Sequence, residues 1–333
     1  MKQKIYAIIS IILLIICLWL GVTWWSFLKS PLIKADQKPR DFIFPQGMSV
    51  KQVATTLATQ KLLHHPGLFT LLVRLKGLER NLKAGEYRIT PGVTTPLLLL
   101  TKMARGDAVR HTFTIIEGWT FMQVLAALNS NPHVIHTIQN LTSAEIMTKI
   151  SHPGELPEGR FAPDTYLFSG EIKDTKLLIS AYNLMAKRLK KAWQNSDANL
   201  PYHCPYQALI VASLIEKETA IPAEKPLIAG VILRRWSNDR LLQIDPTIIY
   251  GLGDKYKGKL TKADYLKDSP YNTYTRRGLP PTPIAMPSES SIVAALQPII
   301  GSYLYYAAKG DGTHKFSAAM KEQEQAVKKY LRK

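Results

Sequence analysis

Two carboxyl side chains end an otherwise apolar stretch, LIVASLIEKETA, at residues 209–220. If this stretch is a helix, Glu218 shares a face with Leu214 and Ile215, the face that would look toward a core. Glu216 is rotated from it by about 200°. Burial raises the pKa of a carboxyl group, which suits a general acid near neutral pH. The pattern makes Glu218 a candidate catalytic acid; the alternative is a solvated helix end whose glutamates pair with nearby cations.

A second polar set lies in LQIDPTIIYG at residues 242–251. In an extended chain, alternation places Gln243, Asp245 and Thr247 on one side, where they could hydrogen-bond a sugar or an amide. The competing interpretation is structural, because Asp-Pro commonly starts a turn and Asp245 could cap the next helix. Spacing alone favours the structural interpretation.

A third set combines aromatic and polar groups that suit carbohydrate. Tyr271 and Tyr274 flank Asn272 in SPYNTY, and the Pro-rich GLPPTPI that follows would make a rigid wall. His314 follows a Gly-rich turn further along the chain. Each has a structural alternative, a rigid loop for the tyrosines and a packed ring for the histidine.

Motifs for metals and nucleotides are missing from the sequence. The eight histidines are scattered, and the two cysteines, Cys17 and Cys204, form no CxxC pair. Neither a phosphate-binding glycine motif nor a GxSxG turn occurs. The sequence therefore predicts no metal and no cofactor.

The N-terminal stretch from Ile5 to Leu28 carries no charge and is long enough to cross a hydrocarbon core of about 30 Å. Lys2 and Lys4 precede it, so the N-terminus is expected in the cytoplasm and the body outside it. A cleaved signal peptide is the alternative, but such peptides have a shorter apolar core and a small-residue cleavage site. We expect an uncleaved single-pass anchor.

The net charge of +18 predicts a polyanionic partner: nucleic acid, anionic lipid or an acidic polymer such as a cell wall. An anchored body outside the cytoplasm argues against nucleic acid. The charged fraction of 20% and hydrophobic fraction of 46% are typical of a globular chain.

The 333 residues suffice for an anchor and about two domains. The predicted fold class is α+β, with a small α+β module before a larger mixed α/β domain. Loop and short strand are expected over 240–288, and loop over 129–158, because both are rich in turn-forming or polar residues. The expected divisions are a cytoplasmic tail at 1–4, a transmembrane helix at 5–28, a stalk at 29–40, the module at 41–108 and the large domain at 109–333.

Several multi-residue motifs occur in one order: EGRFAPDTY at 158–166, ASLIEKETA at 212–220, LQIDPTIIYG at 242–251, YNTY at 271–274, GLPPTPI at 278–284 and HKF at 314–316. With this order and spacing, the chain over about 110–333 resembles the YceG-like family of endolytic murein transglycosylases. The single N-terminal membrane helix is similar as well. The 41–108 module resembles the LysM-like subdomain of that family.

The resemblance implies cleavage of nascent peptidoglycan strands at the β-1,4 bond between N-acetylmuramic acid and N-acetylglucosamine. The product would carry a 1,6-anhydromuramic end, so the enzyme would be a lyase that limits strand elongation. Glu218 matches the family's catalytic acid/base, in a cleft between its helix and the 240–285 loops. The substrate-binding candidates are Glu216, Gln243, Asp245, Thr247, Tyr271, Asn272, Tyr274 and His314.

The same resemblance implies a place in the inner membrane, with the body in the periplasm, near the penicillin-binding protein synthases. One departure from the family is Thr282, where many relatives have Gly, which predicts a less flexible loop.

Two rival functions remain open on the sequence. A wall-binding scaffold without activity would use the module and the basic charge alone. A plain muramidase would leave reducing ends and needs a second carboxylate, for which Asp245 is the candidate.

Overall fold

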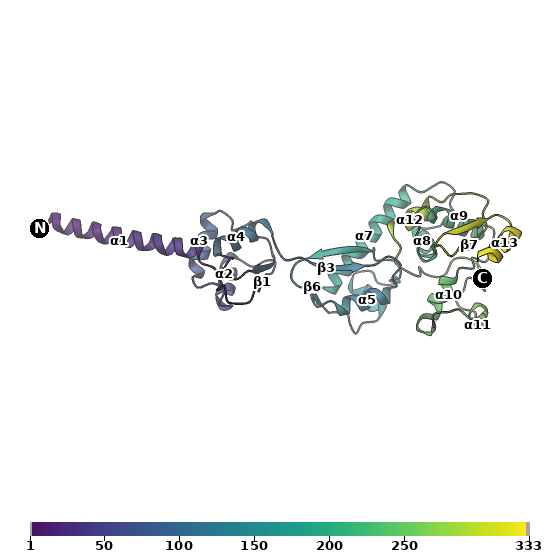
Figure 1. The fold of residues 1–333 in the computed structure, drawn as a ribbon, viewed down its shortest axis with the longest axis horizontal. Coiled ribbons are helices and arrows are strands. Elements are labelled where there is room, and N and C mark those ends of the chain that lie inside the picture. The colour runs from purple at the N-terminus through teal and green to yellow at the C-terminus, as the bar shows by residue number, and fades with distance from the viewer. Residues whose placement is uncertain (1, 331–333) are drawn as a thin grey trace. The chain divides into compact units, whose positions relative to one another are not determined.

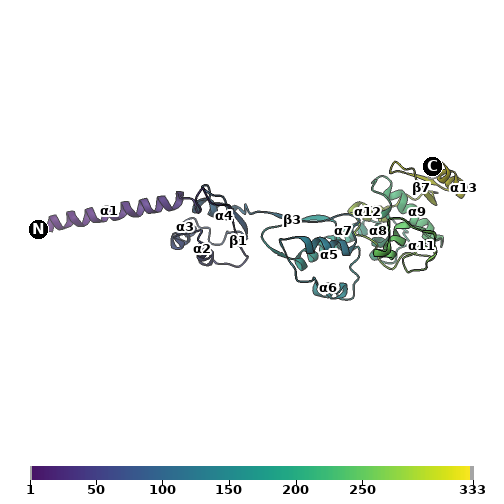
Figure 2. The same cartoon turned by 60° about the horizontal axis from the view of Figure 1, so that its bottom comes forward.

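A computed structural model describes residues 2–330 and divides the chain into two compact units. Unit 1 contains the chain up to Thr112 together with Leu167–Glu171, and unit 2 contains Phe113–Tyr166 and everything from Ile172 onward. The chain passes between the units within strands β3 (His111–Ile115) and β5 (Asp164–Phe168), which pair with each other. Figures 1 and 2 show both units from two sides.

Unit 1 begins with helix α1 (Lys2–Lys29), a single long helix (Figure 1). Its apolar side chains are mostly exposed. It is the one described helix that is long and apolar enough to cross a membrane. A helix whose apolar residues face outward all round needs an apolar environment, so α1 has the properties of a membrane anchor or a signal sequence.

The rest of unit 1 is a small α+β module. Strand β1 pairs antiparallel with β2, from Arg40 opposite Ile89 to Phe44 opposite Gly85. Three helices cover the pair, and a capping box of Ser49 and Gln52 starts the first of them. The elements are β1 (Arg40–Phe44), α2 (Val50–Thr59), α3 (Pro66–Leu75), β2 (Gly85–Ile89) and α4 (Pro96–Arg105).

Residues 29–40, which the sequence suggests as a polar stalk, contribute to the core of this module. Leu32 and Ile33 are buried, and the amide of Leu32 donates a hydrogen bond to the carbonyl of Thr94. Phe27, near the end of α1, belongs to the same apolar cluster, and α1 packs against α4. The long helix and the module therefore share one core.

Unit 2 is built around a buried helix, α8 (Pro205–Glu218). Every residue from Ala208 to Ile215 is buried, and α7, α9, α10 and α12 pack against it (Figure 2). Small pieces of sheet complete the unit: β4 pairs with β6 in parallel, and β7 forms a hairpin with β8 that α13 covers. Tyr306 and Phe316 of this hairpin pack against the apolar cluster that contains α8.

The bounds in unit 2, besides β3 and β5, are α5 (Phe121–Ser130), β4 (Val134–Ile135), α6 (Ser143–Lys149), β6 (Ile172–Lys173), α7 (Asp174–Gln194), α9 (Lys225–Ser237), α10 (Asp245–Leu252), η1 (Gly253–Lys255), α11 (Lys262–Leu266), α12 (Glu289–Leu296), β7 (Tyr305–Ala308), β8 (His314–Ser317) and α13 (Met320–Tyr330).

The region expected to be loop and short strand differs from the expectation. Residues 240–288 contain the helices α10 and α11 and no described strand, and the supposed loop 129–158 contains α6. Both α6 and α11 are short helices that begin with capping boxes, Thr142 with Glu145 and Thr261 with Asp264. Local capping stabilises them where an apolar period is too short to be recognised.

Candidate functional site

Glu218 is the last residue of α8 and lies at the point where the buried helix reaches a partly open surface. The helix stops there because Thr219 is extended, with φ −146° and ψ 141°. Burial raises the pKa of Glu218 to about 7, and the negative charge of Asp245 adds to the rise. About half of the Glu218 side chains are therefore neutral at neutral pH, the form that can donate a proton.

The two glutamates at the end of α8 have different surroundings. Residues Ala208–Ile215 before them are buried on every face of the helix, so no single apolar face selects Glu218, and the charges around each carboxyl group decide its state. Glu216 is 7% exposed and lies 3.2 Å from the Nζ of Lys225, itself 5% exposed. The alternative of a solvated helix end is therefore wrong for Glu216, although its expected pairing with a nearby cation is confirmed.

Hydrogen bonds complete the surroundings of Glu216. Its Oε2 accepts from the backbone amide of Ser288 at 2.9 Å, from the Ser288 hydroxyl and from the Ser291 hydroxyl at 2.6 Å. Burial acts to raise its pKa, but these hydrogen bonds and the charge of Lys225 outweigh burial and lower the pKa. The two glutamates on this turn therefore differ in protonation: Glu216 is ionised, whereas Glu218 titrates near neutral pH.

The carboxylate of Asp245, in the first turn of α10, is held by two tyrosines. Tyr274 donates to Oδ1 at 2.5 Å and Tyr265 to Oδ2 at 3.0 Å. Their rings meet edge to face with centroids 4.8 Å apart. Asp245 is the first residue of α10, but Ile244 is the N-cap and no described side chain caps this helix, so the expected capping role of Asp245 is wrong. Its negative charge instead acts on Glu218.

Gln243, two residues before Asp245, is exposed, and its backbone is left-handed with φ 56°. Arg235 of α9 donates to its side-chain oxygen and, at 3.1 Å, to the carbonyl of Leu242. The Nε of Arg235 is buried without a partner. Among the sequence candidates, Gln243 alone is exposed rather than buried or half-buried.

Thr247 and Asn272 lie inside the loop region, both essentially buried. The Asn272 amide donates to the carbonyls of Tyr265, at 3.1 Å, and Lys267, at 2.8 Å. The Thr247 hydroxyl lies 2.9 Å from that of Thr273. These contacts stabilise the loop that carries Asp245 and its tyrosines, and a role in substrate binding for Thr247 and Asn272 stays a prediction.

The Tyr271 hydroxyl lies 2.9 Å from the hydroxyl of Thr282. Thr282 also donates to the carbonyl of Pro283 at 2.7 Å. A glycine there could make neither contact, so this threonine ties the Pro-rich segment to the tyrosine loop. The Tyr271 ring packs at a tilt of 58° against Tyr250, with centroids 4.8 Å apart.

His314, on β8, is held by Glu224. Its backbone amide donates to the carboxylate at 2.8 Å, and its Nδ1 lies 2.7 Å from the other oxygen. The ring also meets the edge of Tyr306, with centroids 5.5 Å apart. His314 therefore belongs to the surroundings of the site through the β7–β8 hairpin.

Two residues that the sequence did not single out lie at the site. Tyr306, on β7, has a hydrogen-bonding interaction with the carboxyl of Glu218 that favours its ionised form. Arg235 contributes positive charge next to Tyr306 and packs over the ring of Tyr305, 5.4 Å from its centroid. No spacing rule in the sequence connects these residues with Glu218, because Tyr306 lies on the β7–β8 hairpin and Arg235 on α9, and only the folded chain brings these elements to α8.

Glu158 is a second carboxyl group with a raised pKa, in the EGRFAPDTY motif. Burial raises its pKa to about 7, although Tyr250 donates to it at 2.9 Å and the amide of Phe121 at 3.0 Å. It is 6% exposed, which favours a structural role between these segments.

Within residues 2–330, no group of three or more histidine, cysteine, aspartate or glutamate side chains has a metal-binding arrangement.

The chain as a whole is similar to known proteins. Residues 42–329 match the profile of the YceG-like family. An endolytic murein transglycosylase of Bacillus subtilis is 31% identical over 329 residues, covering 91% of this chain and 88% of the relative. A protein of the same name from Streptococcus pneumoniae is 26% identical over 323 residues, but this chain spans only 58% of its length.

The solved structure of a yceG-like protein from Listeria monocytogenes matches this fold with a TM-score of 0.52 and 27% identity. The match covers 87% of this chain and 99% of that one. Both the sequence profile and the fold therefore extend over the module and the larger unit.

Proposed function

This chain belongs to the YceG-like family, and from that premise we propose that it is an endolytic lytic transglycosylase of peptidoglycan. Its substrate is the nascent glycan strand, cleaved within the chain at the bond between N-acetylmuramic acid and N-acetylglucosamine. The observation that carries the proposal is Glu218, a carboxyl group with a pKa near 7 whose neighbours hold it ready to give and take a proton.

One carboxyl group is enough for this reaction. Glu218 gives its proton to the glycosidic oxygen while the bond from that oxygen to C1 of the muramyl residue breaks. The 6-hydroxyl of the same residue then attacks C1, and its proton passes to the Glu218 carboxylate. The products are a free 4-hydroxyl and a 1,6-anhydro ring, and no water is consumed. Hydrolytic glycosidases generally need a second carboxylate, as acid and as base or nucleophile.

The identity of the new ends tests this proposal. The full chain in detergent is incubated with un-cross-linked glycan strands, and the products are analysed by mass spectrometry. We expect anhydro ends, which are lighter than reducing ends by one water. Reducing ends would indicate a hydrolase and point to Asp245 as the second carboxylate. A folded chain that binds strands without cleaving them would favour a wall-binding scaffold.

The activity should fall as the pH rises through about 7. Glu218 acts as an acid only in its neutral form, and its raised pKa keeps that form abundant up to about pH 7. An ordinary glutamate, with a pKa near 4.5, would have lost nearly all of it there. Initial rates of strand cleavage across the neutral range check this. A rate that stays constant well above pH 7 would contradict the assignment.

Replacing Tyr306 with Phe should move that fall in activity to higher pH. The tyrosine favours the charged carboxylate, so its loss raises the pKa of Glu218 further. Tyr303→Phe is a matched control, because Tyr303 lies in the same segment and its ring, like that of Tyr306, packs against Phe316. Coinciding pH profiles for Tyr306→Phe and wild type would show that the hydroxyl does not control the titration of Glu218.

The remaining roles extend the same proposal. Gln243 and Tyr271 would orient the sugar, and Asp245, Tyr274 and His314 would support them around Glu218. Glu216, Thr247 and Asn272 would act by holding the helix and loop in place.

The module of unit 1 would be LysM-like and bind glycan, and α1 would be an uncleaved inner-membrane anchor that leaves the body in the periplasm. The intact mass of the purified protein tests retention of α1.

A further inference from the structure

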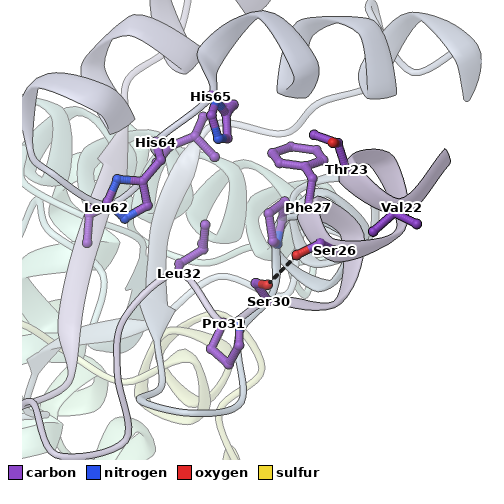
Figure 3. Close-up of a pocket in the computed structure, with 12 residues that line it drawn as sticks. Val22, Thr23, Ser26, Phe27, Ser30, Pro31, Leu32, Leu62, His64 and His65 are labelled. Atoms are coloured by element: carbon purple, nitrogen blue, oxygen red, sulfur yellow. Dashed lines mark hydrogen bonds between the residues drawn. The ribbon is translucent and has the colours of Figure 1, made fainter. Parts of the chain in front are cut away.

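A pocket of about 400 Å³ lies in unit 1, where α1 meets the module (Figure 3). This volume falls within the range of about 300–1,000 Å³ typical of small-molecule sites. None of its lining residues belongs to the site around Glu218. One wall is a face of α1, and the other comprises Leu62–His65, between α2 and α3, with Pro96 of α4.

The α1 wall changes from apolar to polar along its length. Val22, Ser26 and Ser30 follow at four-residue steps, so they lie on one face, with about 12 Å along the axis between the first and the last. The hydroxyl oxygens of Ser26 and Ser30 lie 3.4 Å apart. One end of this wall therefore suits hydrocarbon, and the other suits a hydrogen-bonding group.

The facing wall of the pocket also combines apolar side chains with hydrogen-bonding groups. Leu62 and Leu63 are buried and supply apolar surface, together with Phe27. His64 and His65 follow directly in the chain, with exposed side chains that lie across the pocket from α1 (Figure 3). Imidazole and hydroxyl groups can both donate hydrogen bonds to a phosphate oxygen.

The height of the pocket along α1 matters if the helix crosses a membrane, as proposed above. Trp24 and Trp25 would lie at the outer interface, where indole rings are enriched. Val22 then lies on the hydrocarbon side of the tryptophans and Ser30 on the aqueous side. The pocket would thus straddle the boundary between acyl chains and headgroups, and the molecules available to fill it there are lipids.

We propose that this pocket binds one membrane phospholipid. An acyl chain lies against Val22, Phe27 and Leu62. The phosphodiester lies at the other end, within reach of the two serines and the two histidines. Such a lipid would fix the depth and tilt of the module at the membrane surface. A free phosphate would leave the apolar half empty, and an alkyl chain alone would leave the donors unpaired.

Native mass spectrometry of the full chain, released from nanodiscs of phosphatidylglycerol, tests the proposal. Wild type should retain one phospholipid. Ser26→Trp, which fills the pocket, should lower the retained fraction about tenfold or more. Leu18→Trp is the matched control, because it adds the same indole two turns earlier, at an exposed position outside the pocket. A His64→Ala/His65→Ala double variant should also lose the lipid, since it removes donors to the phosphate.

Three results would overturn the proposal: a wild type that retains no phospholipid, equal retention by Ser26→Trp and Leu18→Trp, or a detergent alkyl chain held as firmly as the phospholipid. The same spectra report the intact mass and so separate this proposal from the anchor. If residues 1–28 are present and no lipid is retained, the pocket proposal alone fails. If they have been removed, the anchor and the pocket fail together, whereas the proposed catalytic activity is unaffected by either result.

Discussion

Glu218→Gln is expected to lower the rate of strand cleavage by about 10²–10⁴-fold, the usual contribution of a positioned general acid or base. Glutamine keeps the shape and burial of the side chain, but it can neither give a proton to the glycosidic oxygen nor accept one from the muramyl hydroxyl. The measurement is the initial rate of release of anhydro-ended fragments by the full chain. Glu324→Gln, at an exposed position on α13, should leave the rate unchanged.

This loss should occur without unfolding. Burial raises the pKa of Glu218 in the folded state, so at any pH above the unfolded pKa its ionisation opposes folding, and the cost grows until the pH passes about 7. A neutral glutamine avoids that cost, and the variant should be at least as stable as wild type at pH 8. A stable Glu218→Gln protein that still cleaves strands at more than about a tenth of the wild-type rate would refute the assignment.

Lys225→Met is expected to destabilise unit 2 by about 3–5 kcal/mol, because it leaves the Glu216 carboxylate buried without its cation. The Lys225 Nζ also donates to the hydroxyls of Ser288 at 2.9 Å and Ser290 at 3.0 Å. The substitution therefore removes these two hydrogen bonds together with the positive charge. Urea unfolding followed by tryptophan fluorescence measures the change, and Lys321→Met, at an exposed site, is the matched control.

A double variant tests whether Glu216 and Lys225 stabilise the fold through each other. In Glu216→Gln/Lys225→Met no charge remains buried, so part of the lost stability should return, and the two changes should be strongly non-additive. Purely additive effects would mean that Glu216 and Lys225 stabilise the fold independently. The pair would then not explain why Glu216 stays ionised two residues from Glu218.

The elements that depend on a long apolar period were predictable from the sequence. The pattern placed α1 and α8 within a few residues of their observed bounds, since a long run of apolar residues is readable in the sequence. The short helices α6, α10 and α11 were missed. They depend on capping by Thr142 or Thr261, or on the Asp-Pro start at Asp245, which the strand interpretation of 242–251 obscured.

The site was predictable only in part. Glu218 could be selected from its apolar context, although the face argument neglected that α8 is buried on every side. Its partners depend on tertiary contacts: Lys225 from the next helix gives Glu216 its charge, and Tyr306 arrives with a hairpin near the end of the chain. Which of two neighbouring glutamates titrates near neutrality is decided by these contacts, and they leave no local pattern.

The shared core of α1 and the module bears on where this protein can be cut. Phe27, Leu32 and Ile33 are all buried in it, with Trp24 and Leu28 packed alongside. A soluble fragment that starts after Lys29 would lack the first of these side chains and uncover the apolar surface beneath it. A protease acting at the membrane surface would expose the same surface. If α1 is the membrane anchor proposed above, cleavage that releases the rest of the chain also uncovers part of the module's core, so the fold disfavours such a release.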